Sequence, residues 1–205
     1  MTLNLNKISK TMSYLLRHGA IKDNIPIRQD GYVLIDDLLK HEQLSGVSLD
    51  IIKKVVEEDN KQRYKLITEK NKNYIRANQG HSMPVKQLEL EEVYDVPQCI
   101  HGTYYEAWKL IHKTGLSKMQ RNHIHFAIDF PKNDKFVSEQ VISGMRSNCQ
   151  IAIYIDAKKC IEDGIKFYKS QNGVILSSGD NNGTILPKYF LKVLDIKTKK
   201  NILKN

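Results

Sequence analysis

The feature that most restricts the fold is a change in hydrophobic period within the N-terminal part of the chain. Apolar residues recur at helical spacing over 7–18 and again after Ser48, which can cap a helix. Two extended segments, 64–68 and 73–77, then flank a polar turn in the pattern of a β-hairpin. Helices followed by a basic hairpin predict a winged-helix lobe over residues 1–82.

A different pattern follows residues 83–97, an acidic, proline-bounded segment that we expect to be a connection. Beyond it, short strand patterns alternate with helical ones, including a helix ended by Gly115 and a hairpin across Asn172-Gly173. The expected fold is α+β, with a mixed C-terminal lobe over 98–205. We expect the lysine-rich tail beyond Ile196 to be flexible.

Several classes of protein are disfavoured by composition. No apolar run approaches the roughly 20 residues needed to span a bilayer, so we expect no membrane association. The N-terminal segment lacks the pattern of a secretory signal. The three cysteines are odd in number and lack metal-ligand spacing, which favours a reduced, cytoplasmic protein.

The charge balance points to a polyanionic partner. The chain carries 32 Lys and Arg against 23 Asp and Glu, a formal net charge of +9. Such an excess raises the local concentration of anions and favours nucleic acid as a partner. The alternative is a lysine-rich composition that only solvates the surface, as the tail lysines do.

Arg17 and His18 close the first helical pattern, directly before Gly19. Cations in a last turn offset the negative end of the helix dipole, and glycine commonly ends a helix, so the pair can be purely structural. The alternative is an anion clamp, in which Arg supplies a planar fork and His a further donor. Arg63, at the mouth of the hairpin, and Arg76, in its second strand, can touch a phosphate backbone or only face solvent.

Two short polar segments contain further candidates. Between hydrogen-bonding residues after a strand, Gly80 allows close backbone approach to a ligand, although glycine in a turn is also routine. A second glycine stands between a histidine and a threonine where another strand ends. The candidates from these two segments are Gln79, His81, Ser82, His101, Gly102 and Thr103.

A third segment contains Ser117, Arg121, His123 and His125. The two histidines share one strand face, but no third ligand has suitable spacing, so we expect no metal. The sequence has no dinucleotide-binding glycine fingerprint, phosphate-binding P-loop or Ser-His-Asp pattern. The arginines have no obvious acidic partner in the sequence, which favours recognition of a phosphate dianion over acid–base hydrolysis.

Taken in order, these segments resemble one family closely, the NAD-dependent RNA (tRNA) 2′-phosphotransferases. Any one motif is weak, but the ordered set is specific and covers about residues 7–192. The segments are MSYLLRHGA, DGYVLIDDLL, KQRYKL, IRANQGHS, IHGTYYEAWKLIHKTGLSKMQRNHIHFA, VISGMRSNCQIAIYID, DGIKFYKSQNGVILSSG and LPKYF.

The resemblance implies an N-terminal winged helix for RNA and a C-terminal ADP-ribosyltransferase-like fold for NAD. It implies removal of the internal 2′-phosphate left at a tRNA splice junction. The RNA phosphate first attacks the nicotinamide ribose and expels nicotinamide, giving ADP-ribosylated RNA. A ribose hydroxyl then attacks phosphorus and releases 2′-OH RNA and ADP-ribose cyclic phosphate. We expect NAD as a co-substrate, and a monomer that is cytoplasmic or, in a eukaryote, also nuclear.

The same resemblance assigns roles to individual residues. The Arg-His-Arg-Arg set of the family falls on Arg17, His18, Arg63 and Arg121. The first two and Arg121 would hold the 2′-phosphate, and Arg63 would chiefly assist the second step. NAD-binding residues are implied at His101, Gly102, Thr103 and Ser117, and further cleft residues at Gln79, His81, Ser82 and Arg146.

Two other classes of function remain open. An ADP-ribosyltransferase could act on terminal phosphates of nucleic acids or on proteins, but no residue matches the glutamate that many protein-modifying members use. A non-catalytic winged-helix binder would need no basic residues dispersed over both lobes. Nicotinamide release and phosphate removal, measured together, separate the three possibilities.

Overall fold

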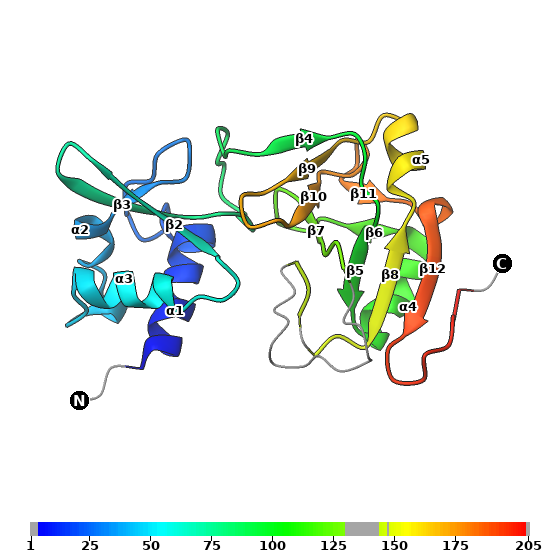
Figure 1. The fold of residues 1–205 in the computed structure, drawn as a ribbon, viewed down its shortest axis with the longest axis horizontal. Coiled ribbons are helices and arrows are strands. Elements are labelled where there is room, and N and C mark those ends of the chain that lie inside the picture. Colours follow the sequence, from blue (N-terminus) through cyan, green and yellow to red (C-terminus); the bar gives the residue numbers. More distant parts are fainter. Residues whose placement is uncertain (1–3, 130–143, 147, 204–205) are drawn as a thin grey trace. The chain divides into compact units, whose positions relative to one another are not determined.

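The computed structural model describes residues 4–129, 144–146 and 148–203 (Figure 1). They divide into two compact units, Met1–Glu89 and Leu90–Asn205, and each unit contains both helices and strands. The chain is therefore an α+β protein. None of the described helices is long and apolar enough to cross a membrane.

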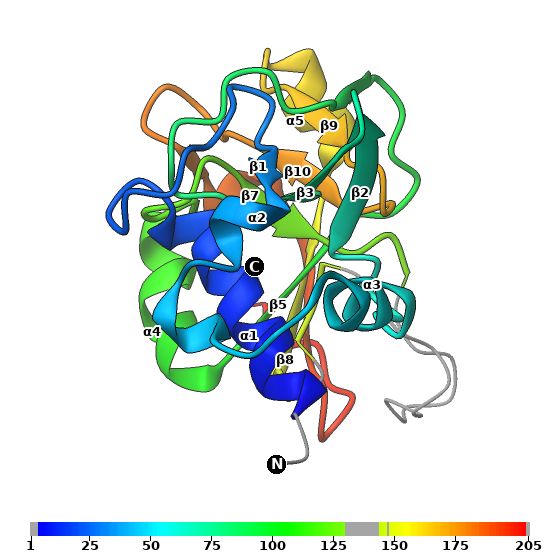
Figure 2. The same ribbon diagram turned by 90° about the vertical axis from the view of Figure 1, so that its left-hand side faces the viewer.

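The first unit packs helices on a small antiparallel sheet. Its helices are α1 (Leu5–Tyr14), α2 (Ile35–Leu38), the 3₁₀ turn η2 (Glu42–Leu44) and α3 (Leu49–Glu57). The sheet has the order β1-β3-β2, formed by β1 (Val33–Leu34), β2 (Tyr64–Glu69) and β3 (Lys72–Ala77). The helices gather on one side of this sheet in two perpendicular views (Figures 1 and 2).

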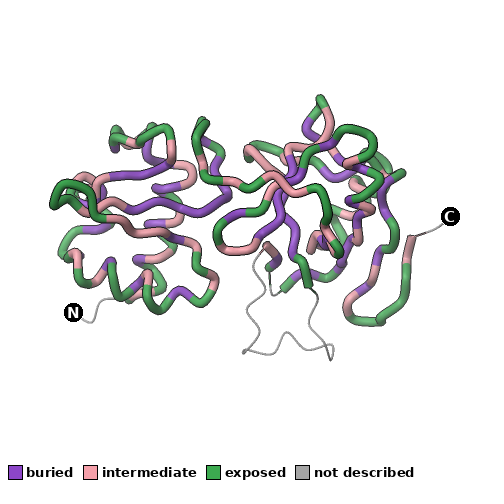
Figure 3. The backbone as a smooth tube through the Cα atoms, turned by 45° about the horizontal axis from the view of Figure 1, so that its top comes forward, coloured by how far each residue is buried: buried purple, intermediate pink, exposed green. Residues whose placement is uncertain are grey.

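Local sequence signals account for several boundaries in this unit. The Ser48 hydroxyl accepts a hydrogen bond from the Ile51 amide at 3.4 Å, which confirms the predicted cap of α3. The predicted hairpin is also confirmed, because Tyr64 to Glu69 pair with Ala77 to Lys72. Apolar side chains of all these elements form one buried core. Figure 3 colours buried residues purple along the backbone.

The end of the first helix differs from the prediction. After Tyr14 the chain does not stop but widens into a π-helical turn, η1 (Leu15–Gly19), in which the Ala20 amide bonds to the Leu15 carbonyl at 2.9 Å. Gly19 is therefore not a helix cap. It is needed for space, since a Cβ atom there would lie 2.7 Å from the Tyr14 ring.

The prediction for Arg76 is wrong, because this residue neither faces solvent nor is available to a phosphate backbone. It is only 1% exposed and is among the largest fully buried side chains. Its guanidinium donates to Glu89 Oε2 at 2.8 Å and to the Asp30 carbonyl at 3.2 Å, and lies 4.6 Å above the Tyr32 ring. Arg76 therefore holds this unit together.

The second unit is built from small antiparallel sheets. A four-stranded sheet has the order β4-β9-β10-β7, a three-stranded sheet the order β12-β8-β5, and β11 pairs with β6. The strands are β4 (Glu91–Val93), β5 (Ile100–Thr103), β6 (Leu116–Ser117), β7 (Ile124–Phe126), β8 (Ile151–Ile155), β9 (Phe167–Lys169), β10 (Ile175–Ser177), β11 (Thr184–Ile185) and β12 (Phe190–Asp195). A bridge between Ile100 and Ala127 joins the two larger sheets.

Two helices and a 3₁₀ turn complete this unit: α4 (Tyr105–Thr114), α5 (Ala157–Glu162) and η3 (Pro187–Tyr189). Gly115 ends α4 with a φ of 93°, as predicted. The hairpin across Asn172-Gly173 is likewise present, because β9 and β10 pair on either side of it. The segment expected to be only a connection also contributes a strand, since β4 pairs with β9.

The lysine-rich tail differs from the flexible segment that we expected. As far as Leu203 it turns back on β12: the Ile202 amide bonds to the Val193 carbonyl at 2.8 Å. The Val193 amide in turn donates to the Asn201 side chain at 3.0 Å. Ile202 and Leu203 pack against the core of the unit. Two apolar residues near the end of a lysine-rich stretch thus explain why this tail folds back.

We predict that Arg76→Ala destabilises the protein by about 2 kcal/mol, because it removes a buried side chain together with its bonds to Glu89 and to a backbone carbonyl. Urea unfolding measures this change. Arg28→Ala is the matched control, since Arg28 also pairs with carboxylates and lies over Tyr32 but its side chain is 41% exposed. Equal losses for both variants would contradict the structural role of Arg76.

Candidate functional site

The π turn and the segment after β3 form one assembly in the first unit. The Ser82 amide donates to the Arg17 carbonyl at 3.0 Å, and the Ser82 hydroxyl lies 2.9 Å from His18 Nδ1. The His18 ring is also flanked by Tyr14, with ring centroids 6.3 Å apart. The structure therefore brings Ser82 together with Arg17 and His18, from which it is separated by more than sixty positions in the sequence.

Gly80 explains how this segment approaches the π turn so closely. It has a φ of 94°, and a Cβ atom at this position would lie 3.3 Å from Arg17 Nε. Gln79 and His81, on either side of it, are 9% and 2% exposed. The backbone of residues 79–82 thus packs on the Arg17 side chain, and a larger residue at position 80 would displace the guanidinium.

Arg63 has an acidic partner, contrary to the expectation from sequence. Its guanidinium pairs with Asp59, whose side chain is 3% exposed. The same carboxylate accepts from the amides of Arg63 and Lys61, at 2.5 and 3.2 Å. The Arg63 carbonyl accepts from the Asn78 amide at 2.8 Å, so Arg63 lies beside the start of the 78–82 segment.

In the second unit, the sheets orient His101. Its Nδ1 atom lies 2.9 Å from the His125 carbonyl oxygen, which can only accept, so Nδ1 donates and Nε2 is left as an acceptor. Burial lowers the pKa of His101 below its ordinary value of 6.5, and the charges of Arg121 and Arg146 lower it further. His101 is therefore neutral at neutral pH, with its tautomer fixed.

Arg121 and Arg146 place two positive charges near this histidine. The pKa of Arg121 is lowered by loss of solvent and by the charge of Arg146, so the two guanidinium groups repel each other. Arg146 donates to the Tyr104 hydroxyl at 3.4 Å, and Tyr104 donates to Asn148 at 2.9 Å. Within the described residues, neither arginine pairs with a carboxylate.

The remaining predicted residues of this unit occupy structural positions. A Cβ atom on Gly102 would lie 2.9 Å from Cys149 Sγ, so this glycine makes room for protein side chains. Thr103 is buried and pairs with Ile151. The Ser117 hydroxyl accepts from the Met119 amide at 3.1 Å, in a turn that leads to Arg121.

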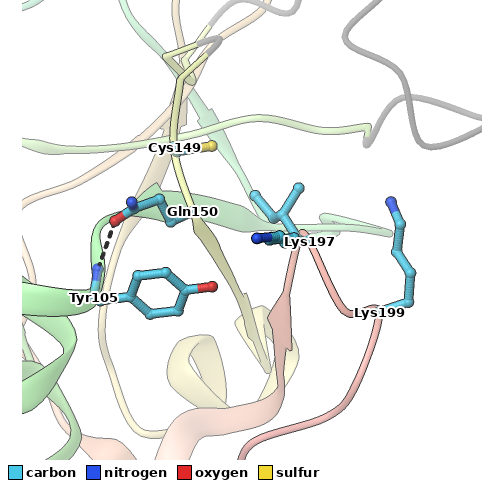
Figure 4. A pocket seen from close by; sticks show the side chains of 6 residues that line it. Tyr105, Cys149, Gln150, Lys197 and Lys199 are labelled. Atoms are coloured by element: carbon cyan, nitrogen blue, oxygen red, sulfur yellow. Dashed lines mark hydrogen bonds between the residues drawn. The ribbon is translucent and has the colours of Figure 1, made fainter.

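A cavity of about 340 Å³ lies elsewhere on the second unit (Figure 4). Tyr105, Cys149, Gln150 and Lys197 are among its lining residues, and the Tyr105 amide donates to the Gln150 side chain at 3.1 Å. None of the residues predicted from the sequence lines it, so the cavity does not mark the candidate site.

The pair of histidines considered for a metal has other surroundings. His123 packs edge-on against Tyr168, with centroids 6.0 Å apart, and His125 is buried in β7. In the described part of the chain, no group of three or more His, Cys, Asp or Glu residues could hold a metal ion.

Sequence reasoning overlooked residues that hold the predicted ones in place. The i, i+4 spacing of Asp59 and Arg63 is a signal that could have identified their ion pair. Tyr104, directly after the predicted strand residues, could have been identified as an aromatic partner for an arginine. The backbone carbonyl that orients His101 leaves no such signal, because any residue at position 125 supplies it.

Comparisons with known proteins agree on one family. A family model described as RNA 2′-phosphotransferase, Tpt1 / KptA family, matches residues 4–179. The chain is 43% identical over 198 residues to tRNA 2′-phosphotransferase 1 of Danio rerio, covering 93% of this chain and 86% of that protein. It is 41% identical to tRNA 2′-phosphotransferase 1 of Homo sapiens, over 93% of this chain and 76% of that protein. It is 35% identical to the Saccharomyces cerevisiae tRNA 2′-phosphotransferase, over 84% of this chain and 78% of that protein.

We predict that His101 titrates below pH 6.5 in the folded protein, and that Arg121→Gln moves this pKa upward by removing one of the repelling charges. Histidine ring NMR signals followed against pH measure both values. Because the unfolded chain binds this proton more readily, the stability linked to His101 is present at neutral pH and is lost as the pH falls below 6.5. A His101 pKa above 6.5 would contradict the described environment.

Proposed function

This chain belongs to the RNA 2′-phosphotransferase (Tpt1/KptA) family, and we propose that it removes the internal 2′-phosphate of spliced tRNA by transferring it to the ADP-ribose part of NAD. The matched family and the activities for which its relatives are named support this function. The observation that carries it is the Arg17–His18 pair, held on a π turn by Ser82 and by the backbone at Gly80. Such a rigid pair of cationic and hydrogen-bonding groups suits a phosphate dianion.

We further propose that the first unit acts as a winged-helix RNA-binding lobe and the second as an ADP-ribosyltransferase-like lobe. The helices and three-stranded antiparallel sheet of the first unit support the former assignment. The small antiparallel sheets around His101 support the latter. We expect the protein to act as a monomer in the cytoplasm.

The residues of the second unit fit NAD. The Nε2 atom of neutral His101 can accept a hydrogen bond from a ribose hydroxyl, and the charges of Arg121 and Arg146 suit an anionic ligand. When bound, NAD supplies an electrophilic ribose carbon that carries a good leaving group, nicotinamide. Gly102, Thr103 and Ser117 would support this site through the backbone of their strands, as their packing indicates.

The chemistry requires positioning more than proton transfer. The 2′-phosphate is already a dianion at neutral pH and needs no general base to act as a nucleophile. Arg17, His18 and Arg121 would hold its oxygens, and Gln79 and His81 would belong to the same ligand-binding region. In the second step the phosphorus accepts a ribose hydroxyl and the bond to the RNA 2′-oxygen breaks. Arg63, oriented by buried Asp59, would stabilise the charge that develops on the phosphoryl oxygens.

One assay tests this function against the alternatives. The wild-type protein is incubated with NAD and an RNA oligonucleotide that carries a single internal 2′-phosphate, and free nicotinamide and 2′-OH RNA are both measured. We expect equal amounts of the two products. Nicotinamide without phosphate removal would indicate an ADP-ribosyltransferase instead, and no nicotinamide at all would indicate a non-catalytic RNA binder.

We predict that Arg17→Ala lowers kcat/KM for 2′-phosphorylated RNA by about 100-fold, or about 2.7 kcal/mol, because a charge-assisted contact with the phosphate is lost. Steady-state kinetics at varied RNA concentration measure the change. Arg28→Ala, an exposed arginine of the same unit, serves as the control and keeps activity close to the wild type. If both variants behave alike, Arg17 has only a structural role in the π turn.

We predict that Arg63→Ala allows ADP-ribosylated RNA to accumulate, since the second step needs this charge more than the first. Asp59→Asn gives a weaker form of the same effect, because it removes the carboxylate that orients Arg63. Single-turnover reactions separated on denaturing gels detect the accumulating species. Equal loss of both steps in Arg63→Ala would contradict this division of roles.

A further inference from the structure

The segment that carries Arg121 is held at both of its ends by the same part of the chain. Arg121 lies between β6 and β7. At the first end β6 pairs with β11, where Ser117 lies opposite Thr184. At the other end β7 pairs with β10. Because β10 and β11 are joined by residues 178–183, this short loop connects the two supports, as Figure 1 shows.

The 178–183 loop is organised by the side chain of Asp180. Its Oδ1 atom accepts from the Asn182 amide at 2.9 Å and from the Thr184 amide at 3.0 Å. The Asp180 amide also donates to the Thr184 carbonyl at 2.9 Å. A carboxylate that accepts two backbone amides fixes a tight loop, because charge-assisted bonds of this kind are among the stronger ones in proteins.

A series of backbone hydrogen bonds leads from this loop to Arg121. The Gly183 amide donates to the Asp180 carbonyl at 2.9 Å, and the Gly183 carbonyl accepts from the Lys118 amide at 2.9 Å. The Lys118 carbonyl in turn accepts from the Arg121 amide at 3.1 Å. The turn is closed by Ser117, whose hydroxyl accepts from Met119, a residue with a φ of 55°. These hydrogen bonds connect the 178–183 loop to the backbone of Arg121.

The glycines at this junction show how closely the two segments approach. A Cβ atom on Gly115, which precedes β6, would lie 2.6 Å from the Ile185 carbonyl oxygen. A Cβ atom on Gly179 would lie 2.5 Å from the Thr184 amide nitrogen. In both cases the obstacle is backbone, which cannot move aside as a flexible side chain can. The start of β6 therefore lies close to β11, and the 178–183 loop closes tightly on itself.

We propose that Asp180 is a positioning residue that holds Arg121 in place through the 178–183 loop. Arg121 and Arg146 repel each other, and within the described residues no carboxylate orients Arg121 as Asp59 orients Arg63. The series of backbone hydrogen bonds that begins at Asp180 constrains the Arg121 segment instead. Asp180 lies just beyond residues 4–179, which the family model matches. The link to phosphate binding rests on the proposed function, whereas the link to the position of Arg121 does not.

The test compares Asp180→Ala with Asp156→Ala. Asp156 is the matched control because its carboxylate also accepts a backbone amide, that of Lys159 at 3.0 Å, but at the start of α5. Hydrogen exchange of residues 117–121 is measured on the protein alone, without NAD or RNA. We expect exchange there to become about tenfold faster in Asp180→Ala and to stay unchanged in Asp156→Ala.

Kinetics give a second readout. A general loss of stability would lower the thermal midpoint, whereas a loss of positioning would raise the KM for RNA without that decrease. We expect Asp180→Ala to raise the KM for 2′-phosphorylated RNA by about tenfold while the thermal midpoint stays close to that of Asp156→Ala. Asp180→Asn keeps one acceptor oxygen and should restore most of the wild-type value. Identical exchange and identical KM in the two alanine variants would overturn the proposal.

A pair of glycine variants tests the same proposal from the other segment. Gly115 and Gly164 both follow a helix with φ near 90°, but nothing lies within 4 Å of a Cβ atom on Gly164. We expect Gly115→Ala to accelerate exchange at 117–121 and Gly164→Ala to leave it unchanged. Equal exchange in both would contradict the part of the proposal in which the junction of β6 with β11 supports the Arg121 segment. If the wild type proves inactive with NAD and 2′-phosphorylated RNA, the proposed function fails, and the exchange data still decide on the loop.

Discussion

The hydrogen bond between Ser82 and His18 is the contact on which the arrangement of the candidate phosphate site depends. It joins the end of the first helix to the segment after β3, and the amide of the same serine bonds to the Arg17 carbonyl. Arg17 and His18 lie in the π turn that follows α1, which is wider than a turn of a regular α-helix. The glycine at position 80 lets the backbone lie directly on the arginine.

The chain orients its arginines in two physically different ways. Arg63 is held by a buried carboxylate, which fixes its direction but offsets part of its charge. Arg121 is held through backbone bonds and close packing, which leave its charge uncompensated within the described residues. The difference matches the proposed roles, since a group that holds a dianion benefits from full charge and a group that assists one step benefits from exact orientation.

Sequence patterns predicted those features that depend on local chemistry. The Ser48 cap, the glycine that ends α4 and the hairpin across Asn172-Gly173 each follow from a few neighbouring residues. The π turn could not be predicted, because the apolar residues before it have ordinary helical spacing. Gly19, which leaves room for the Tyr14 ring, looks like a helix cap in the sequence.

Long-range contacts explain the other differences. Arg76 looked like an exposed hairpin residue, because its partners lie at positions 30, 32 and 89 and share no local pattern with it. The strand β4 was hidden in an acidic segment, since its pairing with β9 depends on residues about 75 positions further along. For the candidate site, the ordered motifs predicted which residues to consider, but not which neighbours orient them.

A crystal structure of the protein with an RNA that carries an internal 2′-phosphate is the most direct test of the phosphate site. We expect oxygens of this phosphate to accept hydrogen bonds from the Arg17 guanidinium and from His18, with the His18–Ser82 contact retained. A 2′-phosphate bound away from the π turn, with Arg17 contacting only the backbone at Gly80, would contradict it.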